Sequence, residues 1–185
     1  MISLSALWLP ILLSAVAVFV VSSIIHMMSP WHKGDYPALP NESALGDAVR
    51  PLNLPPGDYM IPRPASTADM KSDAFKEKVN RGPNLILTVI PNGPRPMGKY
   101  LVSWFVYLLV VTVFAAYIGG CVAISGDHRA SIHAVALTAF IGYTLALYQM
   151  SIWYHRKWST TLKMTLDGLI YAVVTLFIFG ALWPQ

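Results

Sequence analysis

Hydrophobic residues in this chain gather in four long blocks, and Asp167 is the only acidic residue inside them. Each block is about as long as the ~20 residues that a helix needs to cross a ~30 Å hydrocarbon core. Backbone N–H and C=O groups in hydrocarbon must form hydrogen bonds within the protein, so only helices and closed β-barrels can cross a membrane. Barrel strands alternate apolar and polar residues, and the continuous apolar runs of this chain exclude them. The pattern therefore predicts an all-α integral membrane protein. Its four transmembrane helices are expected at residues 1–26, 99–125, 130–155 and 162–184.

The segment 27–98, between the first two predicted helices, contains twelve of the fourteen prolines. Proline interrupts helices and central strands, so only short elements are expected in this Pro-rich segment. Two short helices are expected at 42–49 and 73–80, capped by Asn41 and Ser72. Two extended stretches, at 59–61 and 85–90, can pair as a two-stranded sheet. Such a sheet is marginal in water on its own. We therefore expect the segment to pack on the membrane face or on a partner.

Positive charge gives the four helices an orientation. Four crossings place both termini on one side of the membrane and the segments 27–98 and 155–163 on the other. Most Lys and Arg residues lie in or beside these two segments, and only Arg129 lies on the side of the termini. Because Lys and Arg are retained in the cytoplasm during insertion, we expect the Pro-rich segment to be cytoplasmic and both termini outside. All six tryptophans lie near predicted helix ends, as expected for the headgroup layer.

Composition narrows the classes of function. Hydrophobic residues make up 55% of the chain and charged residues 12%, which points to lipid rather than to a soluble domain. The first block is longer than the core of a signal peptide and has no basic residue before it, so we expect a retained membrane anchor. A single cysteine, Cys121, excludes an internal disulfide and a Cys-based zinc site. The net charge of +4 is explained by orientation, and no nucleic-acid motif accompanies it.

Small residues predict where the helices pack. Lipid provides no hydrophobic force between helices, so close contact depends on small side chains that let backbones approach. The predicted packing positions recur mainly at four-residue spacing and are Ala134, Thr138, Gly142 and Ala146 on the third helix, with Gly168 and Ala172 on the fourth. We interpret these stripes as packing within one chain, with a contact between copies as the alternative.

Asp167 is the first candidate for chemistry, because a carboxylate inside a membrane helix is costly and often functional. It follows Lys163 by one helical turn, about 6 Å along the axis. The structural interpretation is an ion pair with Lys163, Arg156 or Lys157 near the start of the helix. The functional interpretation is proton or substrate handling.

Three histidines, His26, His32 and His155, share the inner side of the predicted topology, and Met27 and Met28 lie between the first two. Imidazole and thioether groups bind copper, and two imidazoles can hold a haem iron. The spacing matches no established metal motif, and a polar belt at the membrane interface is the other interpretation. If the histidines form a binding site, the expected cofactor is haem or copper. If they form an interfacial belt, no cofactor and no metal are expected.

Enzyme signatures are absent from the sequence. It contains no Gly-rich phosphate loop, no His-Glu-x-x-His and no Gly-x-Ser-x-Gly, so no catalytic residue is predicted. We predict a non-enzymatic accessory or structural subunit that docks to a larger membrane complex or a soluble partner through its Pro-rich segment. A metal-handling or redox membrane protein is the alternative. A small oligomeric transporter or channel is the third interpretation, and its pore would need several copies because the midplane of one chain is almost entirely apolar.

A resemblance to other proteins indicates the kind of organism and membrane that the protein comes from. The stretch 151–163, followed by 167–172, resembles a group of uncharacterised bacterial inner-membrane proteins of similar length. The resemblance extends to 58–60 and 69–71 and so covers most of the chain. It implies a bacterial inner membrane and carries no assigned activity.

Overall fold

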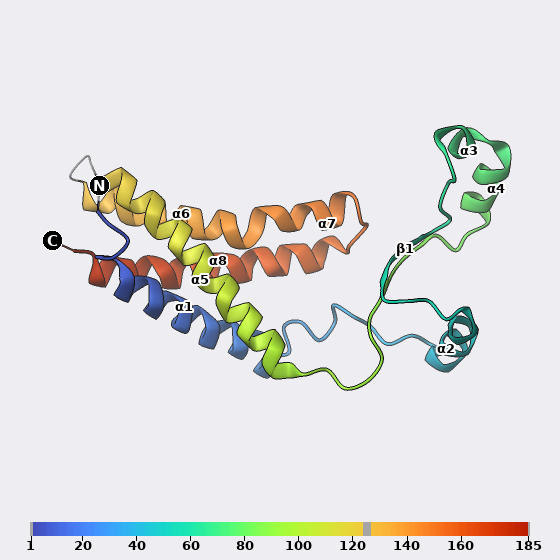
Figure 1. The fold of residues 1–185 in the computed structure, drawn as a ribbon, viewed down its shortest axis with the longest axis horizontal. Helices are drawn as coiled ribbons and strands as arrows, with labels where there is room; N and C mark the ends of the chain where they lie inside the picture. Colours follow the sequence, from blue (N-terminus) through green and yellow to red (C-terminus); the bar gives the residue numbers. More distant parts are fainter. Residues whose placement is uncertain (1, 124–126, 185) are drawn as a thin grey trace. The chain divides into compact units, whose positions relative to one another are not determined.

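A computed structural model describes residues 2–123 and 127–184, which form two compact units (Figure 1). The first unit combines the chain up to residue 37 with the chain from residue 96 onward, and the second consists of residues 38–95. The first unit is a helical bundle of α1 (Trp8–Ser23), α5 (Met97–Val122), α6 (His128–Thr144), α7 (Tyr148–Ile152) and α8 (Trp158–Leu182).

Four helical segments among the described residues are long and apolar enough to cross a membrane, which confirms the predicted number. They span Trp8–Met28, Met97–Val122, His128–Ile152 and Trp158–Leu182. Large apolar side chains on their outer faces are exposed; Phe114 and Phe177, for example, are 63% and 69% accessible. Exposed apolar helix faces of this kind suit contact with lipid.

The four segments pack as a ring in the order α1, α5, α6, α8. α1 begins and α8 ends at the same end of the bundle, while the connections at residues 29–37 and 153–157 lie at the opposite end (Figure 1). At this second end α1 stays beside α5, and both diverge from α7 and α8 (Figure 1). A hydrogen bond from Trp104 Nε1 to Ser22 Oγ, 2.9 Å long, joins α1 to α5 there.

Close packing inside the bundle depends on small residues at helix crossings. A Cβ added at Gly168 of α8 would clash with the Thr144 side chain on α6. A Cβ added at Gly119 of α5 would clash in the same way with Val135. The ring therefore closes only because these two positions lack a side chain.

The third apolar helix is not continuous, which differs from the predicted single helix over 130–155. α6 ends at Thr144, a 3₁₀ turn spans Leu145–Leu147, and α7 follows and ends at Ile152. Thr144 Oγ1 donates to the carbonyl oxygen of Phe140 at 2.6 Å. A threonine hydroxyl that binds the carbonyl four residues earlier bends a helix, and the interruption follows directly after it.

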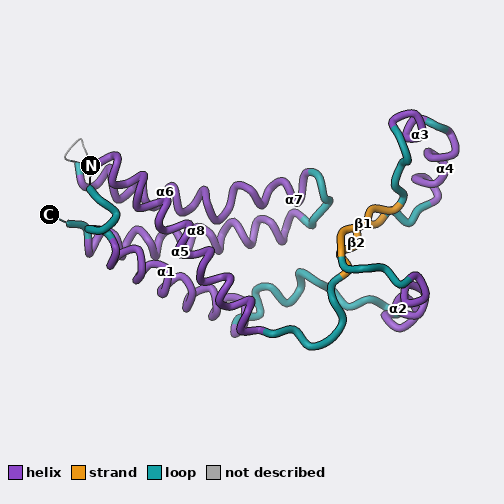
Figure 2. The backbone as a smooth tube through the Cα atoms, in the orientation of Figure 1, coloured by secondary structure: helices purple, strands orange, loops and turns teal. Residues whose placement is uncertain are grey.

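The second unit consists of short elements joined by loops (Figure 2). They are α2 (Glu42–Val49), a 3₁₀ turn (Arg50–Leu52), β1 (Gly57–Ile61), α3 (Thr67–Lys71), α4 (Asp73–Arg81) and β2 (Leu85–Val89). The strands pair antiparallel, with Gly57 opposite Val89 and Ile61 opposite Leu85. Both predicted short helices and the predicted sheet are confirmed, whereas α3 was not predicted from the sequence.

Local hydrogen bonds hold these short elements. The Asn41 side chain accepts from the backbone N–H of Ala44 at 3.0 Å, and Ser72 accepts from that of Phe75 at 3.1 Å, as the predicted caps require. Ser66 caps α3 through the N–H of Asp69. The structure describes every residue from 38 to 95, and none of them is buried. The unit therefore has no hydrophobic core of its own.

Candidate functional site

The site begins where α1 ends. α1 runs into a π-helical turn, Ile24–Met28, that contains His26 and closes with a hydrogen bond from the Ser29 N–H to the Ile24 carbonyl, 3.0 Å long. Single π turns in helices are frequent at functional sites. The chain then becomes extended at Ser29, and His32 follows four residues after Met28.

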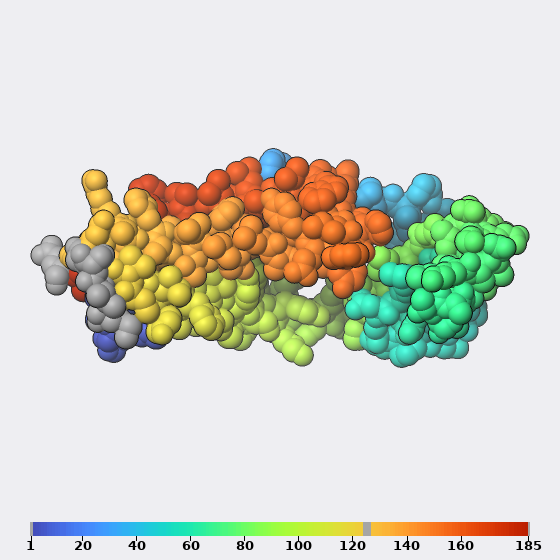
Figure 3. Space-filling model, turned by 90° about the horizontal axis from the view of Figure 1, so that it is seen from above, coloured from blue at the N-terminus to red at the C-terminus, as the bar shows by residue number. Residues whose placement is uncertain are grey.

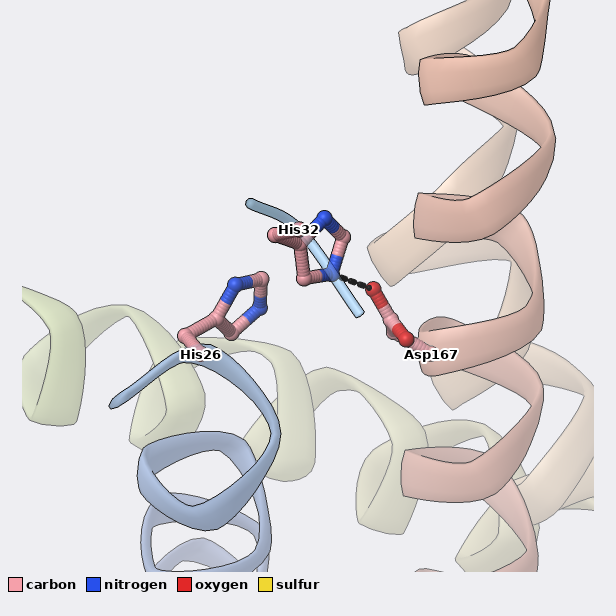
Figure 4. A group of neighbouring side chains, drawn as sticks. All are labelled: His26, His32 and Asp167. Carbon is pink, nitrogen blue, oxygen red and sulfur yellow. Dashed lines mark hydrogen bonds and ion pairs between the residues drawn. The ribbon is translucent and has the colours of Figure 1, made fainter. Parts of the chain in front are cut away.

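His32 returns over His26, so that the two imidazole rings stack (Figure 4). Their centroids are 4.4 Å apart and their planes differ by 17°. His26 is exposed and His32 is half-buried. Figure 4 shows Asp167 approaching the pair from α8, a helix that lies more than a hundred residues away in the sequence.

Each ring nitrogen of His32 contacts a different carboxylate. Nε2 lies 2.9 Å from Asp167 Oδ2, and Nδ1 lies 2.7 Å from Asp35 Oδ2. Both carboxylates are almost inaccessible, with side chains 4% and 7% exposed. The His32 ring is therefore held between two carboxylates, one at each ring nitrogen.

Lys163 completes this network from α8. Its Nζ donates to Asp35 Oδ1 and to the Trp31 carbonyl oxygen, both at 2.8 Å, and lies 5.5 Å from the centre of the Trp31 ring. Burial by itself raises the pKa of Asp35, but the hydrogen bonds from Lys163 and His32 outweigh it, so the pKa lies below its usual range. We call the set Asp167, His32, Asp35 and Lys163 the clasp, because it fastens the loop 29–37 to α8.

The donor atoms of His26, His32 and Asp167 lie within 4.8 Å of one another. Two imidazoles and one carboxylate suit divalent ions such as Zn²⁺, Fe²⁺ or Co²⁺. Bonds of about 2.1 Å to a common ion require donors roughly 3 to 3.5 Å apart, so a separation of 4.8 Å must close by roughly 1.3 to 1.8 Å.

Asp35 has the place of the outer-sphere carboxylate in such a centre. Metal-binding histidines generally donate the second ring N–H to a carboxylate, which fixes the tautomer and orients the ring. The contact of His32 Nδ1 with Asp35 leaves Nε2 directed at Asp167, where an ion would replace the proton between them. Metal and proton therefore compete for the same nitrogen.

A cavity of about 310 Å³ adjoins the site on the bundle side. It is lined by His26, Trp104, Tyr107, Tyr143, Leu147, Met164, Asp167 and Tyr171. All four apolar segments contribute to these walls. The surface is hollowed between the start of α5 and the end of α6 (Figure 3).

Two tyrosines give this cavity polar groups. The Tyr171 hydroxyl lies 3.3 Å from His26 Nε2, which connects the cavity to the stacked histidines. Tyr143 is only 7% exposed, and its buried hydroxyl has no more than a weak contact with the Thr112 side chain among the described residues. A buried hydroxyl without a full hydrogen bond is costly, so this group is a place where a bound molecule would be stabilised.

The structure brings together some of the predicted candidates and separates others. His26, His32 and Asp167 converge, whereas His155 lies exposed in the turn between α7 and α8 with a φ of 55°. Asp167 contacts His32 instead of the basic residues expected beside it, and Lys163 binds Asp35.

The sequence did not assign Asp35, Tyr143 or Tyr171 to the site, although the two tyrosines stand out as polar residues in apolar helices. Asp35 follows His32 by three residues, and Tyr171 follows Asp167 by one helical turn. Those spacings are a usable signal for neighbouring side chains. Tyr143 carried no such signal.

The predicted packing residues are distributed over several environments. Gly168 and Ala172 on α8 are buried. On the third segment, Ala134 and Thr138 are half-buried, and Gly142 and Ala146 are exposed. The buried stripe of α6 is offset from them and consists of Ser131, Val135, Ala139 and Tyr143, with Thr144 beside it.

Comparisons with models of protein families, with curated proteins and with solved structures found no match for this chain. The functional argument therefore depends on the side chains of the site.

Proposed function

We propose that the protein is an integral membrane metalloprotein that holds a divalent transition-metal ion between His26, His32 and Asp167. The convergence of these three donors from two separate parts of the chain supports the proposal. Three protein ligands leave coordination positions open, as in metal centres that act on a ligand rather than only stabilise a fold. The clasp residue Asp35 provides the outer-sphere contact that such a centre requires.

The geometry favours a borderline divalent ion over haem or copper(I). Histidine rings stacked 4.4 Å apart leave no room for a porphyrin between them. The methionines that suggested copper, Met27 and Met28, are 66% and 79% exposed, and a carboxylate is a hard ligand.

Metal analysis of the purified protein tests the proposal. After removal of loosely bound ions, we expect about one Zn²⁺, Fe²⁺ or Co²⁺ per chain, and a visible d–d spectrum after loading with Co²⁺. His26→Ala should abolish binding, because His26 is a ligand but makes no hydrogen bond or ion pair within the clasp. His155→Ala is the matched control and should bind normally. A protein that loads no metal at neutral pH, or a His26→Ala variant that loads as wild type does, would refute the proposal and leave the clasp as a structural network.

We also propose a bacterial inner membrane as the location, with residues 38–95 in the cytoplasm and both termini outside. The supporting observation is the concentration of Lys and Arg in the segments that connect the helices at one end of the bundle. A phosphatase fused after residue 184 should be active, since this reporter works only outside the cytoplasm. An inactive phosphatase fusion together with a fluorescent cytoplasmic reporter would reverse the orientation.

A second function is favoured by the unit at residues 38–95, which contains no buried residue. We propose that it docks to a partner protein as part of a membrane complex. Chemical cross-linking in native membranes followed by gentle purification should recover a partner attached to this unit. A purified monomer whose residues 38–95 resist limited proteolysis without a partner would contradict this function.

A further inference from the structure

We propose that the cavity beside the site binds the head group of a membrane-soluble quinone. This inference goes beyond the metal site, because the walls and the polar groups of the cavity are present without an ion. It concerns binding only and involves no electron transfer.

The walls fit a flat, mostly apolar ring. Trp104 and Tyr107 stack on each other at 5.3 Å, and Tyr143 contacts both Tyr107 and Tyr171 edge to face. These aromatic groups, with Leu147 and Met164, offer ring faces and a polarisable thioether to a planar ligand.

The polar groups fit a ligand with oxygen atoms on that ring. The Tyr143 hydroxyl has only a weak contact with Thr112 among the described residues and can donate to a carbonyl oxygen. Tyr171 and His26 form a second polar position, with Asp167 next to them on the cavity wall. A quinone presents two carbonyl oxygens on opposite sides of one ring, and so it can use two separate hydrogen-bonding positions at once.

Size and depth select a head group whose tail stays in lipid. The volume of about 310 Å³ lies at the lower limit for ligand pockets, so one or two rings enter and an isoprenoid tail does not. Asp167 is nine residues into α8, about 14 Å from its start, and Tyr171 is one turn deeper. Tyr107, a wall residue, is 38% exposed on the outer face of α5, where a tail can leave the cavity. A ligand of this kind reaches the cavity from the bilayer.

Binding of menadione (2-methyl-1,4-naphthoquinone) to the full chain in lipid nanodiscs tests the inference. Quenching of tryptophan fluorescence reports binding, because Trp104 lines the cavity, and empty nanodiscs correct for partitioning into lipid. 2-Methylnaphthalene, which has the same rings without the oxygens, is the matched ligand and is measured by its displacement of menadione. We expect menadione to bind at least fivefold more tightly.

Variants then localise the interaction. Tyr143→Phe should weaken menadione binding about fivefold, the usual worth of one neutral hydrogen bond. Tyr117→Phe, which changes an exposed tyrosine of α5 outside the cavity, should have no effect. Leu147→Trp should exclude the ligand by filling the cavity.

Two results would overturn the inference: equal affinity for 2-methylnaphthalene, or an unchanged affinity in both Tyr143→Phe and Leu147→Trp. Equal affinity would identify the cavity as a space for apolar groups in general, and unchanged affinity in both variants would place menadione outside the cavity. Each titration is repeated on protein treated with a chelator. Menadione binding without metal loading would refute only the metal proposal, and metal loading without menadione binding would refute only this one.

Discussion

The helical bundle and the unit at residues 38–95 are held together in opposite ways. The bundle buries small and apolar residues at helix crossings and fastens its loop 29–37 to α8 with the four side chains of the clasp. The other unit buries no residue and depends on caps, one two-stranded sheet and ion pairs in water. An interaction of the same chemical type should therefore have a large effect in the bundle and a small one in the other unit.

The sharpest test compares two aspartates that each pair with a basic side chain. Asp35→Asn removes the negative charge between His32 and Lys163, and we expect a loss of about 3 kcal/mol of bundle stability. Asp47→Asn removes the partner of Arg50, where both side chains are at least 70% exposed, and should cost no more than about 0.5 kcal/mol. Thermal unfolding in detergent measures both. Equal effects would show that the clasp is not a desolvated network.

Two glycines of α8 provide the second test. Gly168→Ala should destabilise the bundle by about 2 kcal/mol, because its new methyl group would clash with Thr144. Gly180→Ala, in the same helix, meets nothing within 4 Å and should be neutral or stabilising by up to about 1 kcal/mol. A neutral Gly168→Ala would mean that α6 and α8 are not packed as closely as described.

Two tyrosines of the cavity should respond with opposite signs. Tyr143→Phe removes a buried hydroxyl that has only a weak contact with Thr112, and it should stabilise the ligand-free protein by about 1 kcal/mol. Tyr107→Phe removes a 2.8 Å hydrogen bond to the Gly142 carbonyl oxygen and should destabilise it by about 1 kcal/mol. The measurement is the unfolding midpoint of each variant in the same detergent, and a destabilised Tyr143→Phe would reveal a partner for that hydroxyl.

The smallest effect is expected in the second unit. Ser72→Ala removes the cap of α4 and should destabilise that helix by about 1 kcal/mol. Because the unit has no core, we expect faster amide exchange within α4 and an unchanged unfolding midpoint of the bundle. A lower midpoint would show that the two units unfold together.

Features that depend on neighbouring residues in the sequence could be predicted. The four apolar helices follow from segment length, and α2 and α4 follow from Asn41 and Ser72, whose caps act over three residues. The sheet follows from two short extended runs bounded by proline and glycine.

Features that depend on tertiary contacts could not be predicted from the sequence. A four-residue spacing defines a stripe on the third helix but does not identify which of several stripes is buried, since the lipid-facing side of a membrane helix is as apolar as its packed side. The π turn that returns His32 over His26 has no sequence signature. For the same reason Asp35 was overlooked, and His155 was grouped with histidines that it does not join.

The position of the clasp also has a mechanical consequence. The chain enters the unit at residues 38–95 only three residues after Asp35, a reach of about 10 Å of extended backbone. Tension applied to residue 38 is therefore borne first by Asp35 and Lys163, and next by His32 and Asp167. A pull transmitted through residue 38 would load these four side chains before it strains α1.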